Sequence, residues 1–163
     1  PRPQPPSTPP DVTHLCEQNS IMQHLGRKHG LYGSNLQENA LVDMVLSFLE
    51  RIHSPAYKFH SVSEEEKAEE MKKLTDTSQR GGGSLVLLEK QLGRTEGVFV
   101  AGDKPTIADY AAFEYCSQLR NAFPALFSEE ICPNVLKLLS TMAARPGIKA
   151  YLESRPEGYS TSK

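Results

Sequence analysis

The chain has 163 residues, of which 38% are hydrophobic and 23% charged, a composition typical of a globular protein with its own core. Its formal net charge of −2 excludes the basic footprint of a nucleic-acid-binding protein, because basic residues are scattered along the chain and matched by acids. The run Leu85–Leu88 is far too short to cross a bilayer, and residues 1–10 lack the apolar core of a signal peptide. We therefore expect no nucleic-acid partner and no membrane partner.

The cysteines and histidines indicate neither a disulfide framework nor a metal site. Cys16, Cys116 and Cys132 cannot form a complete set of disulfides, and no pair has ligand spacing such as C-x-x-C. The histidines do not cluster with acids at metal-ligand spacings. Reduced thiols in a cytosol-like compartment are the simplest interpretation, so we expect a cytoplasmic protein without bound metal.

The N-terminal part predicts an extended lead, one strand and one helix. Residues 1–10 contain six prolines and are expected to be extended, polyproline-like or disordered. Residues 11–16 favour one short strand, which needs a partner sheet to be stable. Asn19 or Ser20 is expected to cap the following helix, and Gly30 is its natural stop.

A long amphipathic helix is expected next, starting at Ser34 or Asn35. Its apolar residues recur at three- and four-residue steps, so the helix should bury a broad stripe, and Pro55 is expected to bound its end. The stripe consists of Leu36, Ala40, Leu41, Met44, Val45, Phe48, Leu49 and Ile52.

The middle of the chain predicts two further helices separated by glycines. A capping box at Ser63 and Glu66 opens the first, and its acidic run 64–70 is read as a solvated face. Gly81–Gly83 predicts a kink or a loop. It is not a phosphate loop, because no Lys-Ser/Thr pair follows it. Helicity should resume through residues 85–92 and stop near Gly93.

The C-terminal part predicts the remaining helices. Thr106 caps a helix whose Asp109 reaches back to the exposed backbone amide, which makes Asp109 a structural residue rather than a general base. Pro133 starts another helix, residues 145–147 break it, and residues 148–152 form a last turn or helix. The inventory of five to seven helices predicts an all-α bundle.

Four segments together resemble the glutathione S-transferase family, with its mu, pi and sigma branches nearest. Residues 21–33 resemble the last helix and linker of the N-terminal domain, and residues 41–45 resemble the opening of the second domain. Residues 100–110 are similar to the family's buried capping box, and residues 144–152 resemble its closing segment. The resemblance implies an all-α C-terminal bundle with a remnant strand and helix of a thioredoxin-like domain. The expected parts are a lead at 1–10, the remnant at 11–33, the bundle at 34–156 and a polar tail at 157–163.

The resemblance also implies one site. In the family a Gln or Glu followed by Ser holds the γ-glutamyl group of glutathione at a helix N-terminus, and the match here is Glu17-Gln18-Asn19. Gln18 stands where the family has Ser, so simple helix capping by Asn19 or Ser20 is the competing interpretation. The family's thiol-activating Tyr, Ser or Cys has no counterpart in this chain as given, so we expect no catalytic residue in it.

Two further family positions are altered or ambiguous. Ser47 appears at the position where some branches place an Asp that reaches the partner subunit's glutathione. Tyr57 and Phe59 fall where aromatic residues of the electrophile site lie, and core packing explains them equally well.

Three functions follow from these expectations. The first is a non-catalytic scaffold, dimerisation module or subunit of a larger assembly, which binds a protein partner or a second copy through the helix face 36–52. The alternative is a glutathione transferase that conjugates glutathione to electrophiles and whose catalytic N-terminal domain is missing from this chain. The third is a protein that holds hydrophobic ligands. No cofactor is required, and glutathione is the candidate small-molecule ligand.

Overall fold

The computed structural model describes residues 14–78 and 80–155, except for the side chains of Tyr57 and His60. Within these residues the chain forms α-helices and short 3₁₀ helices without a strand, and one isolated bridge joins Phe99 to Gly102. The predicted all-α bundle is confirmed. Its elements are α1 (Gln18–Lys28), α2 (Leu36–Lys58), η1 (Phe59–Ser61), α3 (Glu64–Thr75), α4 (Ser84–Leu92), α5 (Ile107–Ala122), η2 (Pro124–Leu126), α6 (Pro133–Ala143) and α7 (Pro146–Ser154).

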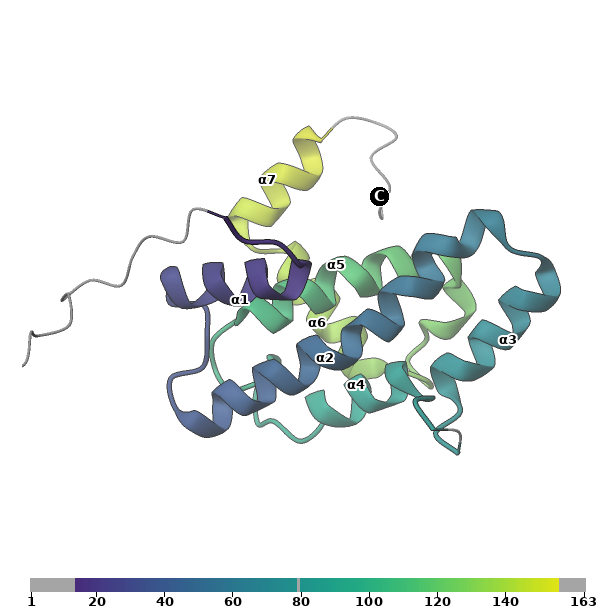
Figure 1. Ribbon diagram of the computed structural model, residues 1–163, viewed down its shortest axis with the longest axis horizontal. Helices are drawn as coiled ribbons and strands as arrows, with labels where there is room; N and C mark the ends of the chain where they lie inside the picture. The colour runs from purple at the N-terminus through teal and green to yellow at the C-terminus, as the bar shows by residue number, and fades with distance from the viewer. Residues whose placement is uncertain (1–13, 79, 156–163) are drawn as a thin grey trace, which may run out of the picture.

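The helices α2 and α5 form the centre of the bundle and pack against each other more extensively than any other described pair. Figure 1 shows them running side by side, with α1 and α7 towards one end and α3 at the other. The buried face of α2 includes Val42, Val45, Leu49 and Ile52, all without exposed surface. Each such side chain contributes about 1.5–3 kcal/mol when it leaves water, so this face is a main source of stability.

Part of the predicted apolar stripe on α2 does not join the core. Leu36 is 79% exposed and Met44 is 43% exposed, and Ala40 lies on the same outer side. These positions recur at four-residue steps and therefore share one face of the helix. The stripe was thus predicted too broad, because part of it lies on the outside of the bundle.

The end of α2 was also predicted wrongly. Pro55 lies inside the helix, which continues to Lys58. A proline removes one backbone hydrogen bond and crowds the carbonyl four residues earlier. Packing outweighs this cost here, because Pro55 is buried and Phe59 at the helix end packs edge-on against Phe123 with ring centroids 5.1 Å apart.

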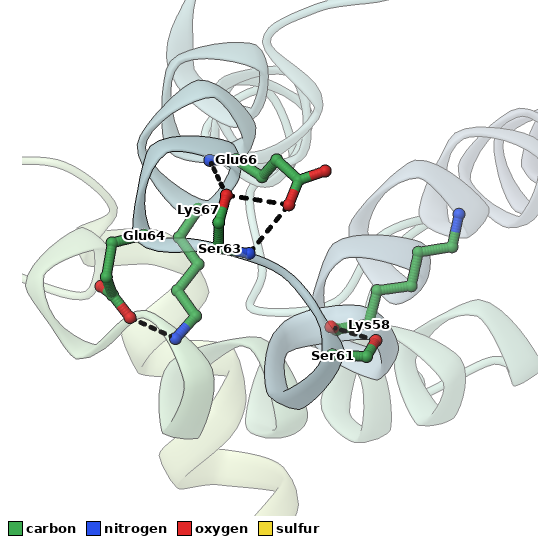
Figure 2. A network of polar contacts seen from close by, with 6 residues as sticks. All are labelled: Lys58, Ser61, Ser63, Glu64, Glu66 and Lys67. Carbon is green, nitrogen blue, oxygen red and sulfur yellow. Dashed lines mark hydrogen bonds and ion pairs between the residues drawn. The ribbon is translucent and has the colours of Figure 1, made fainter.

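The junction from α2 to α3 is a compact polar network (Figure 2). The predicted capping box is confirmed: Ser63 and Glu66 exchange side-chain and backbone hydrogen bonds across the first turn of α3. Lys67 donates to Glu64 at 2.6 Å and also lies 4.3 Å from the ring centre of Phe59. The acidic run is largely solvent-facing as predicted, and it places its charges where the helix dipole favours them.

The predicted interruption at Gly81–Gly83 is a loop rather than a kink, since α3 ends at Thr75 and α4 begins at Ser84. Gly83 has φ 70°, in the left-handed region that side chains disfavour. A Cβ on Gly83 would lie 2.5 Å from Cγ2 of Thr77, so this position requires glycine.

The capping box before α5 is confirmed as the buried structural element that the sequence indicates. Asp109 has no exposed surface and accepts hydrogen bonds from the Thr106 amide at 2.7 Å and the Thr106 hydroxyl at 2.8 Å. It also accepts from the amide of Val100 at 2.8 Å. Burial raises the pKa of Asp109, although these hydrogen bonds oppose the rise.

Helix α6 begins at Pro133 as predicted, whereas α7 begins earlier than predicted. The amides of Asn134 and Val135 at the start of α6 donate to the carboxylate of Glu89 in α4, at 3.1 and 3.0 Å. The break predicted at residues 145–147 lies at Ala144 and Arg145, because α6 ends at Ala143 and α7 begins at Pro146. Proline suits the first position of a helix, where its missing N–H would have no intrahelical partner.

The N-terminal expectations are partly outside the described residues. His14–Cys16, the described part of the predicted strand, is not a strand. Residues 11–13, the lead 1–10 and the tail 157–163 lie outside the described residues, so those predictions stay untested.

Candidate functional site

The N-terminus of α1 carries the predicted residues Glu17, Gln18 and Asn19. The helix begins at Gln18, two or three residues earlier than predicted, so neither Asn19 nor Ser20 caps it. Glu17 occupies the cap position with φ 69° and ψ 123°, and it makes no side-chain cap hydrogen bond. It is the one residue other than glycine with positive φ in the part of the chain that the structure describes. The interpretation of this segment as simple side-chain capping is therefore wrong.

An uncapped N-terminus has a definite electrostatic character. The first amides of a helix have no intrahelical acceptor and stand at the positive end of the helix dipole. In α1 the first amide that bonds back is that of Ile21, which donates to the Glu17 carbonyl at 2.9 Å. The amides of residues 18–20 make no hydrogen bond with any described residue, and such a group of donors suits an anion.

The side chains of Gln18 and Asn19 are held by two helices of the bundle. Gln18 donates its amide N–H to the hydroxyl of Tyr115 in α5. Asn19 donates to Oε1 of Glu50 in α2 at 2.8 Å. Both side chains are thereby engaged away from the backbone amides at the start of α1.

Tyr115 connects this end of α1 to the centre of the molecule. Its ring is 4% exposed and stacks on His53 of α2, with centroids 4.6 Å apart and planes 27° from parallel. Burial and the nearby carboxylate of Glu50 raise the pKa of Tyr115, so its hydroxyl stays protonated at neutral pH. The start of α1 therefore rests on side chains of α2 and α5, among which Tyr115 is buried.

A second set of contacts fixes the other end of α1. The hydroxyl of Tyr32 and the amide N–H of Gln23 both donate to Oδ1 of Asp43 in α2, the latter at 3.0 Å. The guanidinium of Arg27 lies 4.3 Å from the ring centre of Tyr32. Burial and Asp43 together raise the pKa of Tyr32 to about 12. These contacts join α1 and the linker to α2.

The close packing of α1 on α5 depends on Gly26, which is buried. A Cβ at this position would lie 3.1 Å from side-chain atoms of both Ile107 and Tyr32. The linker that follows accepts a hydrogen bond from the Ile107 amide through the carbonyl of Leu31 at 2.7 Å. The predicted remnant helix is thus an integral part of the bundle.

Sequence reasoning missed the residues that support the site. Tyr115, His53, Glu50 and Asp43 lie far from residues 17–19 along the chain, and no local spacing signals their approach. The predicted helical periodicity placed each on α2 or α5, but the rotation of one helix against another is not encoded in periodicity alone.

The other family positions fall in ordinary structural roles. Ser47 is exposed and donates to the backbone carbonyl of Asp43 at 2.7 Å, one turn earlier in α2. Phe59 is half-buried between Phe123 and Lys67, which favours the core-packing interpretation. The side chain of Tyr57 lies outside the described residues.

A cavity of about 620 Å³ lies between the linker, the start of α2 and the loop before α5. Its charged lining residues are Arg27, Glu38, Asp103 and Lys104, two of each sign. None of Glu17, Gln18 and Asn19 lines it. This cavity is therefore separate from the predicted site.

The described residues contain no helix long and apolar enough to cross a membrane. Nor do they bring three or more His, Cys, Asp or Glu side chains together at a metal-binding arrangement. Cys16 is exposed and free, and Cys116 and Cys132 are buried and free.

Comparison with known proteins shows which family this sequence matches. Residues 50–155 match the family model described as glutathione S-transferase, C-terminal domain. The chain is 32% identical over 154 residues to glutathione S-transferase P of Homo sapiens, and 29% identical over 145 residues to glutathione S-transferase P 10 of Caenorhabditis elegans. These alignments cover 88% and 89% of this chain, which spans 65% of the length of each relative.

A solved structure shows the same similarity at the level of the fold. The pi-class glutathione S-transferase of Onchocerca volvulus superimposes with a TM-score of 0.70 at 25% sequence identity. The superposition covers 86% of this chain and 65% of the other. The pi class is one of the three branches, mu, pi and sigma, that the sequence was predicted to resemble most.

Proposed function

Since residues 50–155 match its C-terminal domain model, this chain belongs to the glutathione S-transferase family, and we propose that it binds glutathione through the N-terminus of α1. In this proposal the γ-glutamyl end of glutathione lies on the first amides of α1, beside Glu17. The observation that carries the proposal is the backbone of Glu17, held at φ 69° and ψ 123° on an uncapped helix.

The strain at Glu17 supports a binding role. A residue other than glycine costs about 1–3 kcal/mol in such a conformation and keeps it only where the surroundings impose it, which is common at ligand sites. Here the surroundings are the hydrogen bonds of the next two side chains, from Gln18 to Tyr115 and from Asn19 to Glu50.

The chemistry of the ligand matches the chemistry of the helix end. The γ-glutamyl group carries one carboxylate and one ammonium. Free helix amides suit the carboxylate, and the exposed carboxylate of Glu17 suits the ammonium. Gln18, which replaces the family's Ser, donates to Tyr115, and its bulk is therefore held by α5.

For the whole protein we propose the reaction that its relatives' names describe, the transfer of glutathione through its sulfur. This chain supplies the binding half-site and the helical domain. The group that ionises the glutathione thiol comes from outside the described residues in this proposal.

The test is calorimetric titration of the full chain with glutathione at millimolar concentration, repeated with cysteinylglycine, which lacks the γ-glutamyl group. We expect saturable binding of glutathione and none of cysteinylglycine. Glu17→Gln should weaken binding about tenfold, because it removes the partner of the ammonium. Glu65→Gln, an exposed glutamate on α3, is the matched control and should change nothing. Equal binding of both peptides, or an equal effect of both substitutions, would contradict the proposal.

A second variant separates strain from binding. Glu17→Gly relieves the positive φ, so it should raise the free energy of unfolding by about 1 kcal/mol while weakening glutathione binding. Stabilisation with unchanged binding would show that the strain serves no ligand.

The exposed stripe on α2 favours a second function, association of this chain with a second copy as a dimerisation module. Leu36 and Met44 lie on one outer face of the helix with 79% and 43% of their surface exposed. We expect the chain to sediment as a dimer and Met44→Asp to sediment as a monomer. Leu87→Asp, at a similarly exposed position on α4, is the control and should stay dimeric. A monomeric wild type would contradict this function.

The thiols support the proposal of a reducing, cytosol-like compartment. Cys116 and Cys132 are both buried, and both are free. Burial raises the pKa of Cys132 to about 11 and raises the pKa of Cys116 further, so both remain neutral, unreactive thiols.

A further inference from the structure

The cavity of about 620 Å³ lies where the linker, the first turns of α2 and the loop at residues 101–106 meet. These segments approach one another closely. A Cβ on Gly33 of the linker would lie 2.5 Å from the backbone nitrogen of Asn39 in α2. A Cβ on Gly102 of the loop would lie 3.8 Å from Oε1 of Glu38. The walls of the cavity therefore come from parts of the chain that are far apart in sequence and that packing brings together.

Asn39, which lines this cavity, carries a buried oxygen that the protein leaves unsatisfied. Among the described residues, its Oδ1 is the one buried side-chain nitrogen or oxygen without a hydrogen-bond partner. Buried polar atoms almost always have a partner, and leaving one unpaired is costly. Because Oδ1 is an acceptor, a molecule in the cavity that supplies an N–H group would satisfy it.

Two carboxylates add further acceptors to the same lining. Glu38 precedes Asn39 in α2, and its Oε2 accepts from the Ser34 hydroxyl at 2.6 Å and the Ser34 amide at 2.7 Å. These hydrogen bonds lower the pKa of Glu38, so it carries a negative charge at neutral pH. Asp103 is exposed in the loop and makes no ion pair with a described residue. An amide oxygen beside two carboxylates suits an ammonium group.

Two cations complete the charged lining of the cavity. Arg27 and Lys104 are exposed, and neither forms an ion pair within the described parts of the chain. The guanidinium of Arg27 lies over the ring of Tyr32, 4.3 Å from its centre, and the N–H groups at its edge suit a carboxylate. With two charges of each sign, the cavity favours a ligand that also carries both signs.

We propose that this cavity binds the zwitterionic end of an amino acid, either a free amino acid or the γ-glutamyl end of a peptide. The ammonium donates to Oδ1 of Asn39 and to the carboxylates of Glu38 and Asp103. The carboxylate of the ligand accepts from Arg27 and Lys104. The volume is about twenty times that of a water molecule in the liquid, which leaves room for the rest of the ligand. The site is separate from the start of α1, because residues 17–19 do not line it.

The test is calorimetric titration of the full chain with L-alanine at millimolar concentration, beside ethylamine and propionate, which each carry one of the two charges. We expect saturable binding of L-alanine and at least tenfold weaker binding of the other two. Asn39→Ala should weaken L-alanine binding about tenfold. It should not lower the free energy of unfolding in urea, because Oδ1 has no hydrogen bond to lose and alanine favours a helix.

Two matched controls remove groups that do not line the cavity. Gln37→Ala removes an exposed amide two residues before Asn39 and should leave the affinity within twofold of wild type. Lys104→Gln should weaken binding about threefold, whereas Lys28→Gln, at an exposed lysine beside Arg27, should not. Absence of saturable binding, ethylamine or propionate binding as tight as that of L-alanine, or equal losses from Asn39→Ala and Gln37→Ala would overturn the proposal.

A parallel titration with γ-glutamylalanine identifies the source of the zwitterion. Affinity equal to that of L-alanine or higher, and reduced by Asn39→Ala, would assign the cavity to γ-glutamyl peptides. Binding of L-alanine alone would assign it to free amino acids. Glu17→Gln, which should weaken glutathione at the start of α1, should leave the affinity for L-alanine within twofold of wild type. An equal loss from Glu17→Gln and Asn39→Ala would place L-alanine at the start of α1 and overturn the proposal.

Discussion

The substitution Asp109→Asn tests the buried capping box that orders the start of α5. Both carboxylate oxygens of Asp109 are used: one accepts from the Val100 amide, and the other accepts from the amide and the hydroxyl of Thr106. An asparagine keeps the shape but has only one oxygen. Its NH₂ group must therefore face at least one backbone N–H that has lost its acceptor.

The expected loss of stability follows from the less costly of the two orientations that the asparagine side-chain amide can take. With the new NH₂ facing Val100, one buried amide is left unsatisfied, which costs about 1–3 kcal/mol. Loss of the charge-assisted character of the remaining bonds to Thr106 adds about 1 kcal/mol. We expect the free energy of unfolding to fall by about 2–4 kcal/mol, a large share of the about 5–15 kcal/mol typical of a domain.

The assay is urea denaturation followed by circular dichroism, with equal m-values in both proteins as the test of a comparable transition. Asp103→Asn is the matched control, since Asp103 is exposed in the loop that precedes the same helix, and it should cost less than about 0.5 kcal/mol. A loss below about 1 kcal/mol for Asp109→Asn, or equal losses for both variants, would refute the assignment of Asp109 as the buried cap.

Three further predictions rest on other contacts. Gly83→Ala should cost about 2 kcal/mol or more in thermal or urea unfolding, because its Cβ would meet Thr77, whereas Gly81→Ala, with a similar positive φ but open space, should cost only about 1 kcal/mol. Glu89→Gln should lower the free energy of unfolding by about 1–3 kcal/mol, because it replaces the charged acceptor of the first amides of α6; a loss below about 0.5 kcal/mol would contradict that role. Tyr32 has its pKa raised from 10.0 to about 12 in the folded state, so its contribution to stability is present below pH 10 and is lost as the pH rises towards 12. Urea unfolding should therefore show a steeper fall of stability over this range for wild type than for Tyr32→Phe, and parallel curves would contradict it.

Local signals in the sequence predicted most of the helix boundaries correctly. Asn35 caps α2, the Ser63–Glu66 box opens α3, and Gly30 follows the end of α1 in a left-handed conformation. These features depend on residues within one turn of each other, so a single sequence contains them.

The errors arose where tertiary packing outweighs a local preference. Pro55 normally ends a helix, but α2 continues past it because the last turn packs on the bundle. Asn19 is a good capping residue, but it lies within α1 because its side chain bonds to Glu50. Neither contact is visible in the sequence near these residues.

In the candidate site, too, features local in the sequence were predicted and features set by tertiary packing were not. The match of Glu17, Gln18 and Asn19 to a family motif placed the site at a helix N-terminus, which the structure bears out for the helix but leaves untested for glutathione. The strained backbone of Glu17 and the platform of Tyr115 and His53 could not be predicted, because they depend on how α1 packs against α2 and α5.

The most direct test of this account is a ¹⁵N–¹H correlation spectrum of the chain during titration with glutathione. The account predicts that the largest shifts occur at the amides of Gln18, Asn19 and Ser20, which make no hydrogen bond within the described protein. Amides around Ser84, at the start of α4, should not move. Unchanged amides at the start of α1, or shifts confined to another part of the bundle, would contradict the claim that this helix end binds glutathione.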